Sequence, residues 1–188
     1  MTVAQQKVLA GIAKRLNPAG IVWGVGASML LAQYGLIDSP ADIDIIVSLK
    51  DIHEADNLLS VLAEIRNEKE KSDIYLTDFF YEYQLDSVDV DVMSGFKIKQ
   101  QESVFDYEFD KSCVPNVFEF LGESIPFMTL EEWYVLYQLM PNREFKVNLL
   151  EGYFYERGLE YPHLLERLIQ NKSLPETIKC RSLKILSK

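Results

Sequence analysis

The chain has 188 residues, of which 48% are hydrophobic and 26% charged, so it suits one domain, or one domain with a small helical appendage, and excludes extended disorder. The formal net charge of −10 repels phosphate backbones at long range, which disfavours extended nucleic acid as a partner and leaves small phosphorylated ligands open. The two cysteines, Cys113 and Cys180, lack CxxC spacing and no apolar run is long enough to span a bilayer, so we expect a cytoplasmic protein without zinc, a disulfide or a membrane partner.

Short apolar strands alternate with helices in the first third of the chain. Apolar residues at helical spacing predict helices over 8–16, 28–34 and 51–66. Runs of β-branched and aromatic residues predict strands over 21–25 and 42–47. This order of elements is typical of an α/β (α+β) domain.

The hydrophobic pattern then changes from helical spacing to alternation. Residues 67–73 are polar and predict a turn. Over 74–110, apolar and polar residues alternate, which predicts about four antiparallel strands. We expect these strands to turn near Asp86–Ser87 and near Ser94–Gly95.

The last third of the chain is predicted to be helical. Thr129 and Glu132 form a capping box, which starts a helix over 130–140. Further helices are predicted over 143–156, 162–171 and 175–186. We therefore divide the chain into an α/β (α+β) domain, residues 1–120, and a helical C-terminal region, residues 121–188.

Two segments near the N-terminus favour a binding site. Gly26, Ala27 and Ser28 form a turn of small residues between a strand and a helix, where the backbone can approach a ligand and helix N–H groups can meet an anion. Asp42 and Asp44 stand on the next predicted strand. Because residues i and i+2 of a strand face the same side, about 6.6 Å apart, these two carboxylates are expected to lie together.

A second acidic pair, Asp89 and Asp91, alternates with valines in a strand that is otherwise apolar. Aspartate is depleted in strands, and burying an unpaired carboxylate is costly. Both acidic pairs therefore favour a compensating cation, and Mg²⁺ (or Mn²⁺), with its preference for hard oxygen ligands, is the natural one. Carboxylates so placed can bridge two metal ions about 3.5–4 Å apart, as in phosphoryl-transfer sites.

In this order and spacing, the turn and the acidic strands resemble the DNA polymerase β-like nucleotidyltransferases. The resemblance covers roughly residues 20–95 and is strongest to small bacterial members, the minimal nucleotidyltransferases, which have antibiotic-modifying and abortive-infection-type relatives. Residues 126–132, leading to a helix with Arg143 and Lys146, are similar to the helical tail of that family. The resemblance implies a nucleotidyltransferase-like mixed sheet flanked by helices and followed by a helical C-terminal region.

The resemblance also implies an activity, namely transfer of a nucleoside monophosphate from a nucleoside triphosphate such as ATP to a hydroxyl acceptor by a two-metal mechanism. Gly26, Ala27 and Ser28 would then meet the triphosphate, and Arg143 or Lys146 would neutralise phosphate charge. Ala27 stands where the family has a second glycine or serine, with Ser28 displaced by one position.

For the metal site, the resemblance assigns Asp42 and Asp44 as metal ligands. Asp91 or Asp89 would be the third carboxylate, which orients the metal and accepts the proton of the attacking hydroxyl. The choice between these two aspartates stays open, because both alternate with valine in the same strand.

The sequence leaves the acceptor open among a small molecule, a protein side chain and an RNA end. Two other functions compete with the enzyme: a catalytically silent protein that binds a nucleotide or a protein partner, as in a toxin–antitoxin pair, and a structural protein whose acidic strands face water. His53 and His163 are interpreted as surface or structural residues, and Trp23 and Trp133 as core residues.

Overall fold

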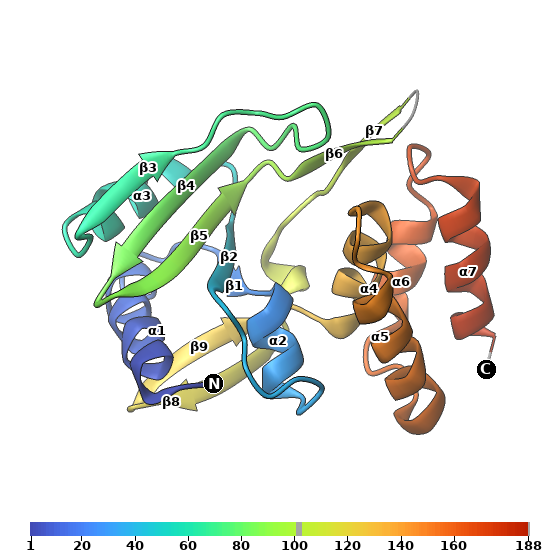
Figure 1. Ribbon diagram of the computed structural model, residues 1–188, viewed down its shortest axis with the longest axis horizontal. Helices are drawn as coiled ribbons and strands as arrows, with labels where there is room; N and C mark the ends of the chain where they lie inside the picture. The colour runs from blue at the N-terminus through green and yellow to red at the C-terminus, as the bar shows by residue number, and fades with distance from the viewer. Residues whose placement is uncertain (101–102, 188) are drawn as a thin grey trace.

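The computed structural model describes residues 1–100 and 103–187. It consists of a seven-stranded mixed sheet with helices packed against it and a bundle of helices at the C-terminal end (Figure 1). The strand order is β3-β4-β5-β2-β1-β9-β8. The strands are β1 (Trp23–Val25), β2 (Ile43–Val47), β3 (Ile65–Glu68), β4 (Phe79–Leu85), β5 (Val88–Ser94), β8 (Asn116–Phe120) and β9 (Glu123–Phe127).

The centre of the sheet is built from apolar strands. β2 pairs in parallel with β5, and β1 pairs in parallel with β9, whereas the other neighbours are antiparallel. Helices α1 (Val3–Leu16) and α3 (Ile52–Ser60) pack against each other and against the sheet, and α2 (Ala27–Gln33) packs on β2. The predicted mixed sheet flanked by helices is confirmed.

The predicted alternation over 74–110 forms four strands, which belong to two sheets. β4 and β5 are joined by Asp86 and Ser87, which both have positive φ angles, of 47° and 62°, as a tight hairpin turn requires. After Gly95, β6 (Lys97–Gln100) and β7 (Ser103–Asp106) form a separate two-stranded sheet. A Cβ on Gly95 would lie 2.6 Å from Oδ2 of Asp78, so the break between β5 and β6 requires glycine at this position.

The predicted helix over 51–66 and the turn over 67–73 were wrong in part. Helix α3 ends at Ser60, and β3 occupies Ile65–Glu68 as an edge strand paired with β4. The side chains of β3 are all exposed, and Ile65 is 50% exposed. Backbone pairing with β4 holds this strand in the sheet. Its side chains are exposed on both faces, so their pattern does not predict a strand.

A 3₁₀ turn over Lys111–Cys113 precedes β8. The C-terminal helices, which follow β9, are α4 (Leu130–Leu139), α5 (Glu144–Arg157), α6 (Pro162–Ile169) and α7 (Glu176–Leu186). The predicted boundary between residues 120 and 121 falls in the turn of the β8–β9 hairpin, and β9 pairs with β1. The segment that contains helices alone begins at Leu130.

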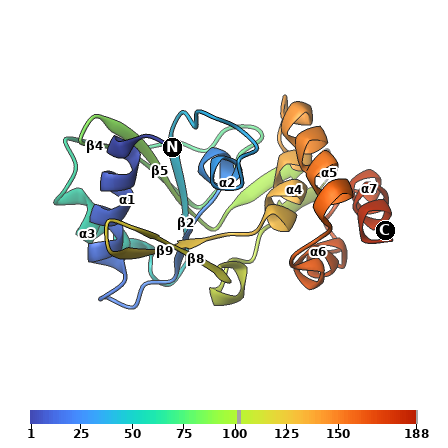
Figure 2. The same cartoon turned by 90° about the horizontal axis from the view of Figure 1, so that it is seen from below.

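Helix α4 connects the sheet region to the rest of the bundle. It lies between α2 and the helices α5, α6 and α7 (Figure 2), and its residues Leu130–Tyr137 are all buried. Buried Glu132 accepts a hydrogen bond of 2.7 Å from the Tyr107 hydroxyl and forms an ion pair of 2.9 Å with Arg167 of α6. Within the described residues, no helix is long and apolar enough to cross a membrane.

Candidate active site

The register of two central strands, β2 and β5, places the first two carboxylates of the site next to each other. Asp44 on β2 lies directly opposite Asp91 on β5 in the parallel ladder. Ile43 and Ile45, on either side of Asp44, are fully buried on the opposite face of the sheet. The alternation that the sequence predicts therefore places both carboxylates on one face, over the apolar core.

Asp42, just before β2, completes a group of three carboxylates. Asp42, Asp44 and Asp91 each offer an oxygen, and these oxygens lie within 4.8 Å of one another. All three residues are partly buried. Asp89 lies outside this group, because its side chain is exposed and accepts a hydrogen bond of 3.5 Å from Gln84.

The three carboxylates perturb one another. Burial raises the pKa of Asp44 to about 7, and the charges of Asp42 and Asp91 add to the shift. Burial also raises the pKa of Asp91 to about 6, again with a contribution from Asp42. Since both shifts reflect desolvation and like-charge repulsion, the group favours a cation.

The small-residue turn packs directly against this acidic group. The Gly26 N–H donates to the backbone carbonyl of Asp44 at 3.0 Å, and Oγ of Ser28 donates to Oδ1 of Asp42 at 3.3 Å. A Cβ on Gly26 would lie 2.2 Å from Nε1 of Trp133. Glycine is therefore required here by the close approach of the indole ring.

Ala27 has an unusual backbone conformation for alanine. Its φ angle is 44°, in the left-handed region that L-residues other than glycine, asparagine and aspartate rarely adopt. Its side chain is buried and lines the pocket beside the carboxylates. The turn therefore stores backbone strain next to the acidic group.

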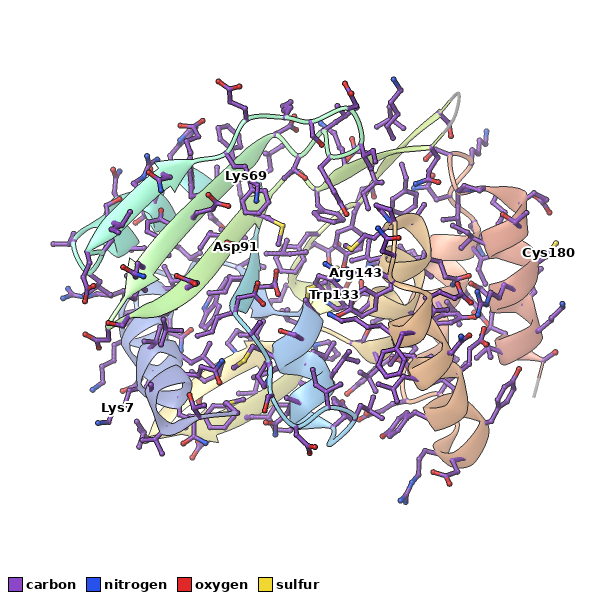
Figure 3. The ribbon with its side chains drawn as sticks, in the orientation of Figure 1. Lys7, Lys69, Asp91, Trp133, Arg143 and Cys180 are labelled. Atoms are coloured by element: carbon purple, nitrogen blue, oxygen red, sulfur yellow. The ribbon has the colours of Figure 1, made fainter. Side chains whose placement is uncertain are left out.

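A pocket of about 330 Å³ lies over the carboxylates. One wall comes from the helical region, and a second wall comes from the connection between β3 and β4 with the start of β4. In Figure 3, Trp133 and Arg143 lie on the helical side, and Asp91 and Lys69 lie on the sheet side. Its lining consists of Ala27, Asp42, Asp44, Lys69, Glu70, Lys71, Ser72, Tyr75, Thr77, Phe80, Asp91, Met93, Phe96, Trp133, Tyr137, Met140, Arg143 and Lys146.

Two cations on the helical wall face the carboxylates. Arg143 is the N-cap residue of α5, and Lys146 lies in its first turn. The Lys146 ammonium donates to the Tyr137 hydroxyl at 3.3 Å and lies 4.8 Å from the centre of that ring. Burial and the nearby Arg143 lower the pKa of Lys146, whereas Asp44 raises it. Both cations lower the pKa of Asp44, so the two charge groups interact across the pocket.

Sequence reasoning missed the wall from the β3–β4 connection. Lys69, Lys71, Tyr75 and Phe80 line the pocket, but the local sequence of 67–73 indicates only a polar turn. No local sequence pattern predicts that this segment lies beside the acidic strands, because its position depends on the pairing of β3 with β4.

Of the other residues singled out in the sequence, His53 and Trp23 lie apart from this site. His53 is exposed and packs edge-on against Phe79, and Trp23 is buried and donates to Oδ1 of Asn17 at 2.9 Å. Neither lines the pocket over the carboxylates. Trp133 is buried as predicted, and it also forms part of the pocket wall.

Comparison with known proteins relates the fold to solved structures. No family model matches the sequence, and no curated protein matches it. A crystal structure of a Thermotoga maritima protein proposed to be a nucleotidyltransferase superimposes with a TM-score of 0.63, at 23% identity, over 81% of this chain and 94% of that one.

The antibiotic-resistance factor ANT(2″)-Ia has a similar structure over a longer span. Its crystal structure in complex with adenylyl-2″-tobramycin gives a TM-score of 0.56, at 12% identity, over 96% of this chain and 97% of that one. Its solution structure gives the same TM-score, at 13% identity, over 100% of this chain and 95% of that one. The chain therefore has the nucleotidyltransferase fold.

Proposed function

We propose that the protein is a nucleotidyltransferase that moves a nucleoside monophosphate from a nucleoside triphosphate to a hydroxyl acceptor, with Mg²⁺ (or Mn²⁺) as cofactor. The observation that carries the proposal is the position of Asp42, Asp44 and Asp91, whose oxygens lie within 4.8 Å of one another at the floor of a pocket with two cations on its opposite wall. The metal ion would neutralise the three carboxylates, and the triphosphate would neutralise Arg143 and Lys146.

The residues present fit a divalent cation. Three carboxylates supply hard oxygen ligands, which Mg²⁺ and Mn²⁺ prefer. Within residues 1–100 and 103–187, none of the three forms an ion pair with a lysine or arginine at 4.0 Å or less. When bound, a pair of such ions supplies positive charge that polarises the α-phosphate and lowers the pKa of the attacking hydroxyl.

The residues of this chain then have separate roles. We assign Asp42 and Asp44 as metal ligands and Asp91 as the third carboxylate, which also accepts the proton of the acceptor hydroxyl. Arg143 and Lys146 neutralise the charge of the β- and γ-phosphates. Positioning and charge stabilisation of this kind account for most of the catalysis in phosphoryl transfer.

Gly26, Ala27 and Ser28 are assigned to the triphosphate as well. Gly26 and Ser28 hold the turn against the acidic group through their hydrogen bonds to Asp44 and Asp42, and of the three residues Ala27 is the one that lines the pocket. The balanced reaction is attack of the acceptor oxygen on the α-phosphorus, with cleavage of its bond to the bridging oxygen and departure of pyrophosphate.

Thermal unfolding with each nucleoside triphosphate, with and without Mg²⁺, tests this function. A ligand that binds only the folded state at 100 times its dissociation constant stabilises it by about 2.7 kcal/mol. We expect a Mg²⁺-dependent rise in Tm, tried first with ATP, that Asp44→Asn abolishes, and release of pyrophosphate once an acceptor is present.

Two other outcomes would point elsewhere. A triphosphate-dependent rise in Tm without turnover for any acceptor would favour the catalytically silent nucleotide-binding protein. No rise with any triphosphate would contradict the proposed function and favour a protein-binding or structural role.

A further inference from the structure

Lys71 lies in the pocket wall opposite Arg143 and Lys146. It belongs to the connection between β3 and β4, and its side chain lines the pocket over the carboxylates. Its Nζ lies 3.0 Å from Oδ1 of Asp78, and about half of the lysine side chain is exposed. An ion pair this exposed contributes little to stability. Lys71 can therefore leave Asp78 at small cost when another anion enters the pocket.

Asp78 keeps a second cation when Lys71 leaves it. Oδ2 of Asp78 accepts a hydrogen bond from the ammonium of Lys97 on β6. Lys97 lowers the pKa of the Asp78 carboxyl more than Lys71 does, so the carboxylate is stabilised mainly by Lys97. Release of Lys71 therefore leaves Asp78 paired, and the cost of an unpaired charge does not arise.

Lys69, two residues earlier in the same wall, is held differently. Its Nζ lies 2.7 Å from Oε1 of Glu82 and 4.6 Å from the centre of the Phe80 ring. Within the described part of the chain, Glu82 has no second cation at 4.0 Å or less. Lys69 also lowers the pKa of Asp91, so it acts on the acidic group from its present position. Lys71 is therefore the lysine of this wall that its partner can release.

The backbone is fixed on both sides of Lys71, so rotation of the side chain is the only movement required. The Lys69 N–H donates to the Phe80 carbonyl at 2.8 Å, and the Ser72 N–H donates to the Tyr75 carbonyl at 3.0 Å. A lysine carries a compact charge on a flexible four-carbon stem. Its ammonium can therefore exchange one anion for another while the loop stays in place.

The pocket is small enough for one ligand to contact both walls. Its volume of about 330 Å³ is at the low end for ligand pockets, which measure about 300–1,000 Å³ and bury most of the ligand. A triphosphate with its α-phosphate at the carboxylates would extend its β- and γ-phosphates between the walls. Arg143 and Lys146 line one side of that space, and the wall that contains Lys71 lines the other.

We propose that Lys71 is a further triphosphate-binding residue, which exchanges Asp78 for the β- or γ-phosphate while Lys97 keeps Asp78 paired. The inference rests on the proposed function, because it takes the triphosphate as the ligand of this pocket. Cations from both walls then hold the bound nucleotide. Asp78 competes with the phosphate for Lys71, so the charge of Asp78 limits the affinity for the nucleotide.

This competition predicts substitutions with opposite effects on the affinity for ATP, measured calorimetrically in Mg²⁺ without an acceptor. We expect Lys71→Ala to weaken binding about tenfold or more, as loss of a charge-assisted hydrogen bond does. Asp78→Asn keeps the shape of the side chain and removes its charge. It should strengthen binding about two- to fivefold, the contribution of an exposed ion pair.

Removal of Lys97 tests the second half of the exchange. Lys97 is not among the described residues that line the pocket, yet its loss leaves Lys71 as the main partner of Asp78. We expect Lys97→Ala to weaken ATP binding about two- to fivefold, and Asp78→Asn added to it to abolish this loss. Lys99→Ala removes an exposed cation of the same strand. It is the matched control and should bind ATP as the wild type does.

The double variant Lys71→Ala/Asp78→Asn shows whether the two residues act through each other. It should bind ATP as Lys71→Ala alone does, because Asp78 then has no phosphate-binding lysine to compete for. If Asp78→Asn strengthened binding equally with and without Lys71, the charge of Asp78 would act on the nucleotide directly, and the exchange would be overturned.

The outcomes also separate this inference from the proposed function. If no triphosphate binds the wild-type protein, the proposed function fails and the role of Lys71 fails with it. If ATP binds the wild type and Lys71→Ala equally, the role of Lys71 is overturned and the proposed function stands. An equal loss of affinity for AMP and ATP in Lys71→Ala would also overturn it, because AMP lacks the β- and γ-phosphates.

Discussion

Asp44 on β2 lies opposite Asp91 on β5 because the two strands pair in parallel with this register. The same alternation places Asp89 two residues earlier on β5, about 6.6 Å away along the strand, where its side chain is exposed. A shift of the register by two residues would place Asp89 opposite Asp44 instead of Asp91, so strand pairing determines which aspartate joins the acidic group.

This register predicts opposite results for two substitutions of the same kind. Asp91→Asn removes a charge from the acidic group, and we expect it to lower kcat at least a hundredfold, since it takes away the carboxylate that we assign as metal ligand and as proton acceptor. Asp89→Asn should keep kcat within about threefold of wild type, because surface substitutions away from a site have small effects. Pyrophosphate release under saturating ATP measures both, and an equal loss in the two variants would contradict the assignment.

The raised pKa values predict how pH affects stability and metal binding. Asp44 and Asp91 have pKa values of about 7 and about 6 in the folded protein, above the ordinary value of about 3.9 in the unfolded chain. The folded state therefore binds more protons than the unfolded state between these limits. Their contribution to the free energy of unfolding falls as pH rises from about 4 through about 7.

Metal binding should change in the opposite direction, because Mg²⁺ binds the ionised carboxylates. We expect the Mg²⁺-induced rise in Tm to be larger at pH 8 than at pH 5.5. Asp44→Asn serves as the control, and it should show a weaker decline of metal-free stability between pH 4 and 7 than the wild type. An equal Mg²⁺ effect at both pH values would argue against a metal site at these carboxylates.

Much of this site could be predicted because its chemistry is local in the sequence. Asp42 and Asp44 share a face through the two-residue period of a strand. Gly26 marks a close approach of the backbone, but the group that approaches it in the structure is the Trp133 indole and not a ligand. These features need no tertiary information beyond the strands themselves. Arg143 and Lys146 were expected near phosphate from the family resemblance, and both line the pocket.

The rest depends on long-range pairing, which local patterns do not contain. The sequence around Ile65 continues the helical spacing of the preceding residues, yet the chain leaves the helix and pairs as β3 with β4. That pairing places Lys69 and Tyr75 in the pocket wall. The choice between Asp89 and Asp91 depended likewise on the register of β5 against β2, so it stayed open until the strands were paired.

Substitution of Gly26 tests the packing between the turn and α4. Its φ angle is −131°, which alanine adopts freely, so the cost of Gly26→Ala comes from the contact at 2.2 Å with Trp133. We expect a loss of about 1–3 kcal/mol in the free energy of unfolding, as overpacking of a core produces. Urea denaturation followed by circular dichroism measures it.

A matched control and a second-site variant isolate the cause. Gly152→Ala on α5 meets no atom within 4 Å and should stabilise the protein by about 0.5–1 kcal/mol, because alanine favours a helix over glycine. Gly26→Ala combined with Trp133→Leu should lose less than the sum of the two single variants. Simple additivity would show that the indole ring is not what excludes a side chain at Gly26.

Ala27 has a positive φ angle at the edge of the acidic group, and this predicts an unusual stabilising substitution. Ala27→Gly removes the left-handed strain of about 1–2 kcal/mol, whereas it loses a buried methyl group and about 0.4–1 kcal/mol through the greater freedom of the unfolded chain. Ala19 is exposed and has no positive φ angle, so at this position only the greater freedom of the unfolded chain applies. We therefore expect Ala27→Gly to be neutral or stabilising and Ala19→Gly to be destabilising, as measured by Tm. If Ala27→Gly lowered Tm as much as Ala19→Gly does, the positive φ angle of Ala27 would not reduce the stability of the folded protein.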